Sequence, residues 1–151
     1  MRDGCRTDVP QLRLVSIDGT PTSANLREAF AREAQAALRC QYFARRADVE
    51  GRADVAAYLR SLADGEAGHG FGHLEFLEEA ADPLAGAGDT PGNLDSAIAE
   101  AEANASAYAD YAAAARKARQ RDIAEWFDAV ATAEHAHVAQ LTRLRRAFEE
   151  D

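Results

Sequence analysis

Four long segments of the chain repeat apolar residues at the three- and four-residue spacing of an amphipathic helix. The spacing predicts helices at about 23–48, 53–80, 91–117 and 120–149. Alanine is abundant and β-branched residues are sparse, which also favours helix over strand. The pattern therefore predicts an all-α protein.

The longest break between these segments is DPLAGAGDTPG (82–92), whose glycines and prolines predict a long crossover loop. Thr90 is expected to cap the third helix, with Pro91 at its first position, and Thr22 or Ser23 to cap the first helix. We expect residues 1–21 to form an N-terminal arm and residues 22–151 to form one helical domain.

The chain also repeats itself at an offset of 68 residues, because VAAYLRSLADGEAGH (55–69) aligns with IAEWFDAVATAEHAH (123–137). The first and third helices follow the same offset, with Leu26 opposite Leu94 and Phe30 opposite Ile98. Two similar helical hairpins packed together predict an antiparallel four-helix bundle, with the crossover between its second and third helices.

Ionisable residues interrupt the apolar seam that three of these helices are predicted to turn inward. The seams are Leu26, Phe30, Glu33, Ala37, Cys40, Ala44; Val55, Leu59, Leu62, Glu66, His69, His73, Phe76; and Ile123, Phe127, Val130, Glu134, His137, Leu141, Leu144, Phe148. A buried carboxylate is costly unless it is paired or bound to a metal. The pattern therefore indicates a shared cation among these carboxylates and imidazoles.

Four stretches resemble the rubrerythrins, a family of the ferritin-like superfamily: AFAREAQAALRCQYFA (29–44), EAGH (66–69), EHAH (134–137) and NLDSAIAEAE (93–102). The resemblance covers about residues 24–146 and implies a ferritin-like bundle with a di-iron site between its helices. It implies metal-ligand roles for Glu33, Glu66, His69, Glu134 and His137. Manganese or zinc also suits such ligands.

The alternative for these five residues is a vestigial site, in which the carboxylates are protonated or paired with one another and with histidine. His73 lies one turn after His69, so it is a replacement ligand, a residue that orients a ligand, or a histidine satisfied within the core.

The third helix departs from the family pattern. The repeat pairs Glu33 with Ala101, where the family has a glutamate, and the family's next carboxylate falls on Asn104. Glu100 flanks Ala101 at about 100° around the helix. A one-residue slip or a π-bulge would turn Glu100 inward, so it is a further candidate ligand.

Three functions from different classes fit these observations. The first is a rubrerythrin-like oxidoreductase that reduces peroxide or dioxygen, a non-haem iron enzyme of the peroxidase or oxidase type. The second is a repurposed ferritin-like oxidase or oxygenase that acts on a small organic substrate. The third is a non-catalytic metal-binding or structural bundle with a degenerate site. The sequence identifies no catalytic residue beyond the ligands.

Composition narrows the classes of molecule that the protein is expected to bind. A formal net charge of −9 argues against nucleic acid and anionic membranes, and no apolar run approaches a membrane span. The first residues lack the apolar core of a signal peptide, so we expect a cytoplasmic protein. Two isolated cysteines form no Cys-x-x-Cys pair, so reducing electrons are expected from a separate donor. The resemblance further implies a homo-oligomer, with a dimer as the expected form.

Overall fold

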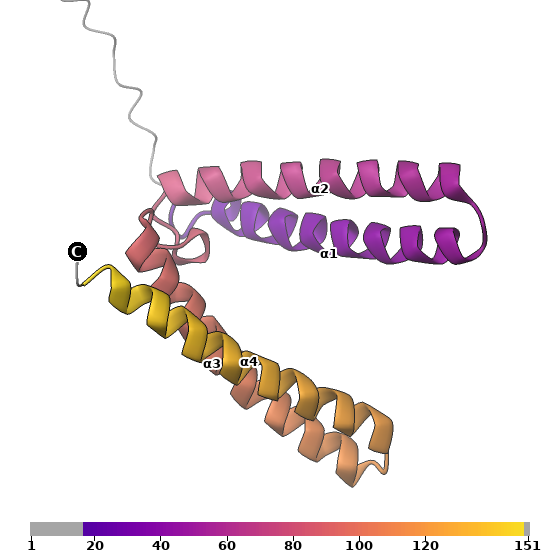
Figure 1. The fold of residues 1–151 in the computed structure, drawn as a ribbon. Helices are drawn as coiled ribbons and strands as arrows, with labels where there is room; N and C mark the ends of the chain where they lie inside the picture. The colour runs from indigo at the N-terminus through magenta and orange to yellow at the C-terminus, as the bar shows by residue number, and fades with distance from the viewer. Residues whose placement is uncertain (1–16, 150–151) are drawn as a thin grey trace, which may run out of the picture. The chain divides into compact units, whose positions relative to one another are not determined.

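The computed structural model describes residues 17–149, which form four α-helices and one short 3₁₀ helix (Figure 1). The α-helices are α1 (Pro21–Val49), α2 (Ala53–Glu79), α3 (Thr90–Lys117) and α4 (Arg121–Ala147), and η1 (Pro83–Ala85) follows α2. No strand occurs within residues 17–149, so the all-α class is confirmed. Each predicted boundary lies within two residues of the observed one. Most of the predicted N-terminal arm lies outside the described residues.

The chain divides into two compact units, residues 1–85 and 86–151. In the first unit α1 and α2 form an antiparallel hairpin, and in the second α3 and α4 do the same (Figure 1). Within residues 17–149, no helix is long and apolar enough to cross a membrane.

Alanine forms the seam of each hairpin. Eleven of the twelve buried apolar residues in the described chain are alanines, and the twelfth is Leu77. On α2 the buried residues recur every seven positions, at Ala56, Ala63, Gly70 and Leu77. Side chains this small let two helix backbones lie close together, and a seven-residue repeat keeps one face turned to the partner helix.

The predicted inward seams need a correction. That of α1 contains the buried residues Ala37 and Ala44. On α2 and α4 each buried residue instead lies one position beyond a predicted one, as Ala56 follows Val55 and Ala124 follows Ile123. The prediction placed the larger apolar residues inward, whereas the close approach of the helices selects the smallest ones.

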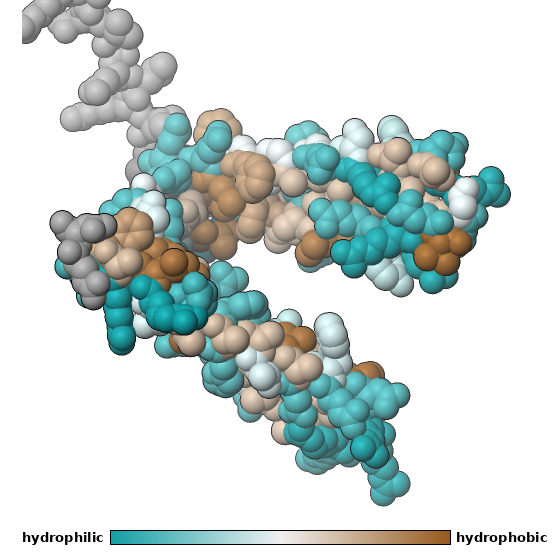
Figure 2. Space-filling view, in the orientation of Figure 1, coloured by the Kyte–Doolittle hydropathy of each residue, from teal (hydrophilic) through white to brown (hydrophobic). Residues whose placement is uncertain are grey.

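Many of the larger apolar side chains are consequently left uncovered by their own hairpin. Val55, Leu62 and Phe76 of α2 are exposed, as are Ile123 and Leu144 of α4. Apolar side chains reach the visible surface of each hairpin (Figure 2). An alanine seam alone buries little apolar area, so these side chains form an apolar surface suited to further packing.

The turns that close the two hairpins repeat the 68-residue offset. Arg52 donates its backbone N–H to Ala47 (2.8 Å), and Gln120 donates to Ala115 (2.9 Å). This six-residue closure is the Schellman motif, which requires a left-handed residue after the helix. That residue is Gly51 in the first hairpin (φ 74°) and Arg119 in the second (φ 61°).

One ion pair beside each turn follows the same offset with its charges exchanged. Asp48 pairs with Arg60 in the first hairpin, and Arg116 pairs with Asp128 in the second. The pairs are half exposed, so each contributes little stability by itself. Their recurrence shows that the two turns place the flanking helices in the same way.

Both observed helix caps differ by one or more residues from the predicted ones. Thr20, not Thr22 or Ser23, caps α1, because its hydroxyl accepts from the backbone N–H of Ser23. Asp89, not Thr90, caps α3, where its carboxylate accepts from Gly92 at 2.7 Å. In each case the residue with an extended backbone and a free side-chain acceptor lies immediately before the first helical turn.

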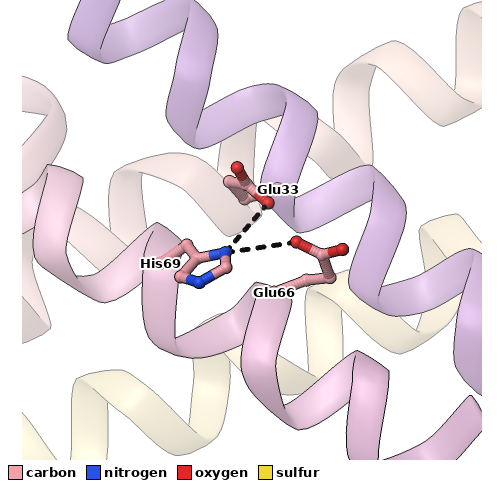
Figure 3. Close-up of side chains that lie close together, drawn as sticks. All are labelled: Glu33, Glu66 and His69. Carbon is pink, nitrogen blue, oxygen red and sulfur yellow. Dashed lines mark hydrogen bonds and ion pairs between the residues drawn. The ribbon is translucent and has the colours of Figure 1, made fainter.

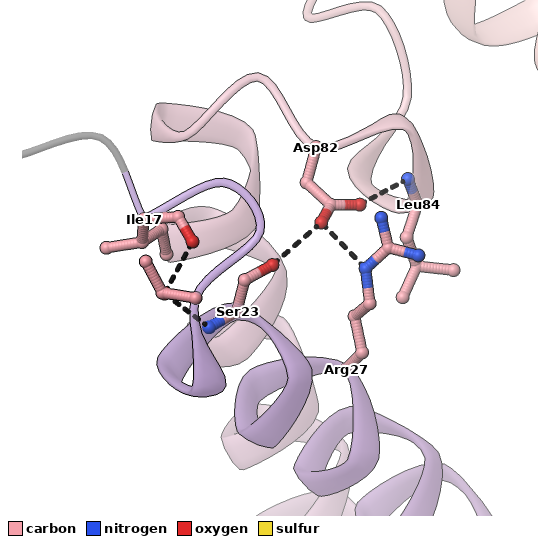
Figure 4. A network of polar contacts seen from close by, with 6 residues as sticks. Ile17, Ser23, Arg27, Asp82 and Leu84 are labelled. Carbon is pink, nitrogen blue, oxygen red and sulfur yellow. Dashed lines mark hydrogen bonds and ion pairs between the residues drawn. The ribbon is translucent and has the colours of Figure 1, made fainter.

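A buried carboxylate joins the loop after α2 to the start of α1 (Figure 4). Asp82 accepts from the backbone N–H of Leu84 (2.9 Å), the Arg27 guanidinium (2.8 Å) and the Ser23 hydroxyl (3.3 Å). The Leu84 N–H, followed by Arg27 and Ser23, lowers the pKa of Asp82 against the opposing effect of burial. The contacts anchor both ends of the first hairpin at one point.

Replacing Arg119 with glycine is expected to stabilise the protein by about 0.5–1 kcal/mol. A left-handed backbone costs most residues about 1–2 kcal/mol, and glycine avoids this cost. Part of the gain is lost, because glycine gives the unfolded chain more conformational entropy. The mirror substitution, Gly51→Ala, is expected to destabilise it. Urea unfolding of both variants measures the two changes. A destabilised R119G protein would contradict the strained left-handed backbone at Arg119.

Asp82→Asn is expected to lower Tm at pH 7. The pKa of Asp82 is lower in the folded protein than in the unfolded chain. Its contribution to the stability of the fold is therefore present at pH values above the unfolded-state pKa of about 4, and it is lost as the pH falls through the folded-state pKa. The Tm difference between D82N and the unmodified protein should therefore shrink below about pH 4. Asp110→Asn, at an exposed aspartate, is the control, and a Tm difference independent of pH would count against the network.

Candidate metal centre

Three potential ligands converge on the α1–α2 hairpin (Figure 3). Glu33 extends from α1, and Glu66 and His69 extend from α2. His69 Nδ1 lies 3.3 Å from Glu66 Oε2 and 3.8 Å from Glu33 Oε2. One ligand atom from each residue lies within 4.8 Å of the other two. Two carboxylates and an imidazole at this spacing form a group able to surround one divalent cation.

The alanine seam positions these ligands. Glu33 lies one turn before buried Ala37 on α1, and Glu66 lies three residues after buried Ala63 on α2. Each side chain therefore emerges at the edge of the seam and is partly covered, with 26% of Glu33 and 23% of Glu66 exposed. His69 is more open, at 66%.

Gly70 brings the α2 backbone close to Glu33. A Cβ at this position would lie 3.7 Å from Glu33 Cβ and 3.7 Å from the Phe30 ring. Gly65, Gly68 and Gly72, which the sequence places in a stripe, have open space where a Cβ would be. Within the described residues, the close approach at the ligands is thus made by Gly70.

The two carboxylates perturb each other. Hydrogen bonding with Glu66, together with burial and the Glu66 charge, raises the pKa of Glu33, although His69 and His73 oppose the shift. The same hydrogen bond, with help from His69, lowers the pKa of Glu66 against the effect of burial. The pair therefore holds a proton on Glu33 more readily than on Glu66. A cation would relieve the same like-charge contact.

His73 lies close enough to affect this pair without joining the three converging ligands. Its charge lowers the pKa of Glu33, and its side chain is half-buried. The geometry is compatible with a residue that supports the ligands, as well as with the replacement ligand considered from the sequence.

The α3–α4 hairpin carries the corresponding Glu–His pair. His137 Nδ1 lies 3.3 Å from Glu134 Oε2, the same distance as between His69 and Glu66. Glu134 is only 17% exposed, whereas His137 is open at 63%. The repeat thus reproduces two of the three ligand positions, and Ala101 occupies the third.

A pocket of about 310 Å³ lies beside this pair. It is lined by Ala97, Glu100, Ala101, Asn104, Glu134, His137, Gln140 and Leu141. Helix α3 runs as a regular α-helix through this region, without a π-helical bulge. Glu100 is exposed and nevertheless shares the pocket with Glu134 and His137, so its ligand role stays a prediction.

Gln140 is the pocket residue that the sequence analysis overlooked. It lies three residues after His137, about one turn along α4, and lines the same pocket as Glu134. The three-residue spacing from His137 could have indicated Gln140. The internal repeat did not, because the equivalent residue of the first hairpin is Gly72, which has no side chain.

The donor groups on α1–α2 suit iron, manganese or zinc, since each of these metals accepts carboxylate and imidazole ligands. The α3–α4 hairpin fits less well. Its equivalents supply one carboxylate and one imidazole, and Ala101 offers no donor.

Comparison with known proteins identifies the family. The family model described as Rubrerythrin matches residues 24–145. The chain belongs to the rubrerythrin family. Rubrerythrin of Nitratidesulfovibrio vulgaris is 32% identical over 142 residues, covering 89% of this chain and 74% of the relative. Rubrerythrin of Clostridium perfringens is 30% identical over 146 residues (89% and 75%), and Rubrerythrin-1 of Clostridium acetobutylicum is 31% identical over 147 residues (90% and 75%).

Membership of the rubrerythrin family confirms the resemblance and places the chain in the ferritin-like class of helical proteins. It also gives the coarse function of a family of iron-binding oxidoreductases. The matched span includes all five predicted ligands and Ala101. The ligand roles of the individual residues stay predictions.

Divalent metal is expected to raise Tm, since an ion that binds only the folded state adds about 2.7 kcal/mol at one hundred times its dissociation constant. Glu66→Gln should remove most of this increase in Tm, because it removes the carboxylate that interacts with both Glu33 and His69. Scanning calorimetry with and without Mn²⁺ tests the expectation.

Glu75→Gln provides the matched control, since Glu75 is an exposed glutamate of the same helix. Metal-dependent stabilisation that is equal in E66Q and E75Q would show that Glu66 does not hold the ion.

Proposed function

We propose that this protein is a rubrerythrin-like oxidoreductase that reduces peroxide or dioxygen at a di-metal centre, with iron as its metal. Its ligands are Glu33, Glu66, His69, Glu134 and His137. The observation that carries the proposal is the convergence of Glu33, Glu66 and His69 within 4.8 Å in a chain of the rubrerythrin family.

The residues divide by chemistry. Glu33, Glu66 and Glu134 supply negative oxygen ligands that balance the charge of the metal, and His69 and His137 supply neutral nitrogen ligands. Reduced iron held by these residues would supply the two electrons that, with two protons, convert hydrogen peroxide into two molecules of water. We propose that a separate electron donor reduces the iron again.

The exposed side of each half-site suits a small oxidant. His69 and His137 are each more than 60% exposed, while the carboxylates beside them are largely covered. Within its own hairpin, each histidine is therefore open to a small oxidant, while the carboxylate beside it is largely covered.

A second candidate is a ferritin-like oxidase that acts on a small organic molecule. The observation in its favour is the pocket beside Ala101, where the family pattern has a glutamate. The third, a non-catalytic bundle, becomes the conclusion if metal binds without any reaction with peroxide or substrate.

We also propose that the protein is a homo-oligomer, at least a dimer, and that it acts in the cytoplasm. The proposal of an oligomer rests on membership of the rubrerythrin family. The cytoplasmic location rests on the sequence of the N-terminal residues alone.

The proposed activity predicts that protein loaded anaerobically with Fe²⁺ consumes hydrogen peroxide and oxidises its iron in proportion. Glu134→Gln should lower the rate by at least about tenfold, since loss even of groups that support metal ligands costs 10- to 100-fold. Stopped-flow absorbance and a peroxide assay measure both changes.

Glu125→Gln is the control for this experiment. Glu125 is an exposed glutamate of α4 that pairs with Arg121, away from the predicted ligands. Rapid peroxide loss without iron oxidation, or equal rates in E134Q and E125Q, would contradict the proposed function.

A further inference from the structure

The two hairpins differ by one chemical group at equivalent ligand positions. Glu66 and His69 correspond to Glu134 and His137, and the His–Glu distance is 3.3 Å in both hairpins. The remaining position is Glu33 in the first hairpin and Ala101 in the second. Relative to glutamate, alanine lacks a CH₂–COO⁻ group, which has the size and chemistry of acetate.

Space for such a group is present beside Ala101. The pocket on the α3–α4 hairpin measures about 310 Å³, and a water molecule takes up about 30 Å³. The pocket can therefore hold a small organic molecule together with water. It is bounded by Glu134 and His137 themselves, so a molecule in it lies beside the ligand pair.

The pocket lining distinguishes one class of guest from others. Ala97, Ala101 and Leu141 offer an apolar wall, and the side-chain amides of Asn104 and Gln140 offer N–H donors. A small molecule with a short apolar part and an oxygen acceptor matches both kinds of surface.

Charge makes the binding of an acid conditional. Glu100 and Glu134 give the empty pocket a negative lining, which repels a carboxylate. A divalent cation on Glu134 and His137 removes this repulsion, because its two positive charges offset the two carboxylates of the pocket. On α1–α2, by contrast, both carboxylates already converge with His69, since the ligand atoms of Glu33, Glu66 and His69 lie within 4.8 Å of one another.

We propose that the α1–α2 hairpin holds one ion tightly with its own three ligands, whereas an ion on the α3–α4 hairpin takes a small carboxylic acid, bound beside Ala101, as its missing ligand. The inference rests on the proposed metal centre and names the class of small molecule that this centre accepts. Acetate is the simplest member, and acids with a short apolar chain use the same wall.

Titration with Mn²⁺ in a buffer free of carboxylates tests the proposal. Calorimetry and the electron paramagnetic resonance of free Mn²⁺ should report one tight and one weak site per chain. Millimolar acetate or propionate should tighten the weak site at least about tenfold and leave the tight site unchanged, because only the Glu134–His137 pair lacks a second converging carboxylate. Acetamide, the neutral analogue, should have no such effect.

Two variants supply the missing carboxylate from the chain itself. Ala101→Glu should bind the second ion tightly without acetate, and added acetate should then have no further effect. Because Ala101 is only 5% exposed, Asn104→Glu provides a second, half-buried position for the same group. Circular dichroism confirms which variant is folded.

Glu66→Gln assigns the two sites to their hairpins. It should abolish the tight site and leave the acetate-dependent site in place. Two equal sites without acetate, an equal response to acetate and acetamide, or folded A101E and N104E proteins that still respond to acetate would each overturn the inference.

The outcomes also separate this inference from the proposed function. If the unmodified protein binds no ion, both fail. If the acetate-dependent second site is found but the iron-loaded protein does not reduce peroxide, only the proposed peroxide or dioxygen activity fails.

Discussion

The close contact of two helices through alanine is the constraint on which the rest of each hairpin depends. Side chains as small as those of Ala56 and Ala63 let α2 approach α1, and this approach leaves no room in that part of the seam for a glutamate. Glu33 and Glu66 therefore emerge at the edge of the seam, facing each other across it and partly shielded from water. The same geometry that fills the seam with methyl groups thus creates the low-dielectric border where two carboxylates can share a cation. A seam of leucines would separate the backbones and with them the ligands.

The internal repeat shows which parts of this design tolerate change. At the hairpin turns the left-handed position is glycine in one copy and Arg119 in the other, and the neighbouring ion pair has its charges exchanged. Both turns nevertheless close with the same hydrogen bonds, because the backbone geometry alone defines them. The ligand positions behave differently. Where the first hairpin has Glu33, the second has Ala101. The helix continues through this position, but the possible metal ligand is absent, since no backbone group can substitute for a carboxylate.

Sequence periodicity predicted the helices well because three- and four-residue spacing is set by the backbone and persists through long segments. It predicted the buried face of α2 poorly, since Val55, Leu62 and Phe76 carry more hydrophobic signal than the alanines and glycine that make the contact. The Glu66–His69 pair was predictable from its three-residue spacing on one helix turn, and its meeting with Glu33 followed from the hairpin. The sequence made Glu100 a candidate ligand only through a slip or a π-bulge, whereas the structure brings it to the pocket of Glu134 and His137 on a regular helix.

Ala101 shows how packing and metal chemistry compete for one position. It is almost fully buried, whereas its counterpart Glu33 keeps a quarter of its side chain exposed. A glutamate at 101 would have to bury a charge that only a bound cation can compensate, so the metal-free hairpin would carry the full cost of desolvation. Alanine removes that cost and stabilises the hairpin without metal. In the proposed half-site, the affinity for metal would depend on what enters the pocket from solution, so that small-molecule binding and metal binding at Glu134 and His137 would be thermodynamically linked.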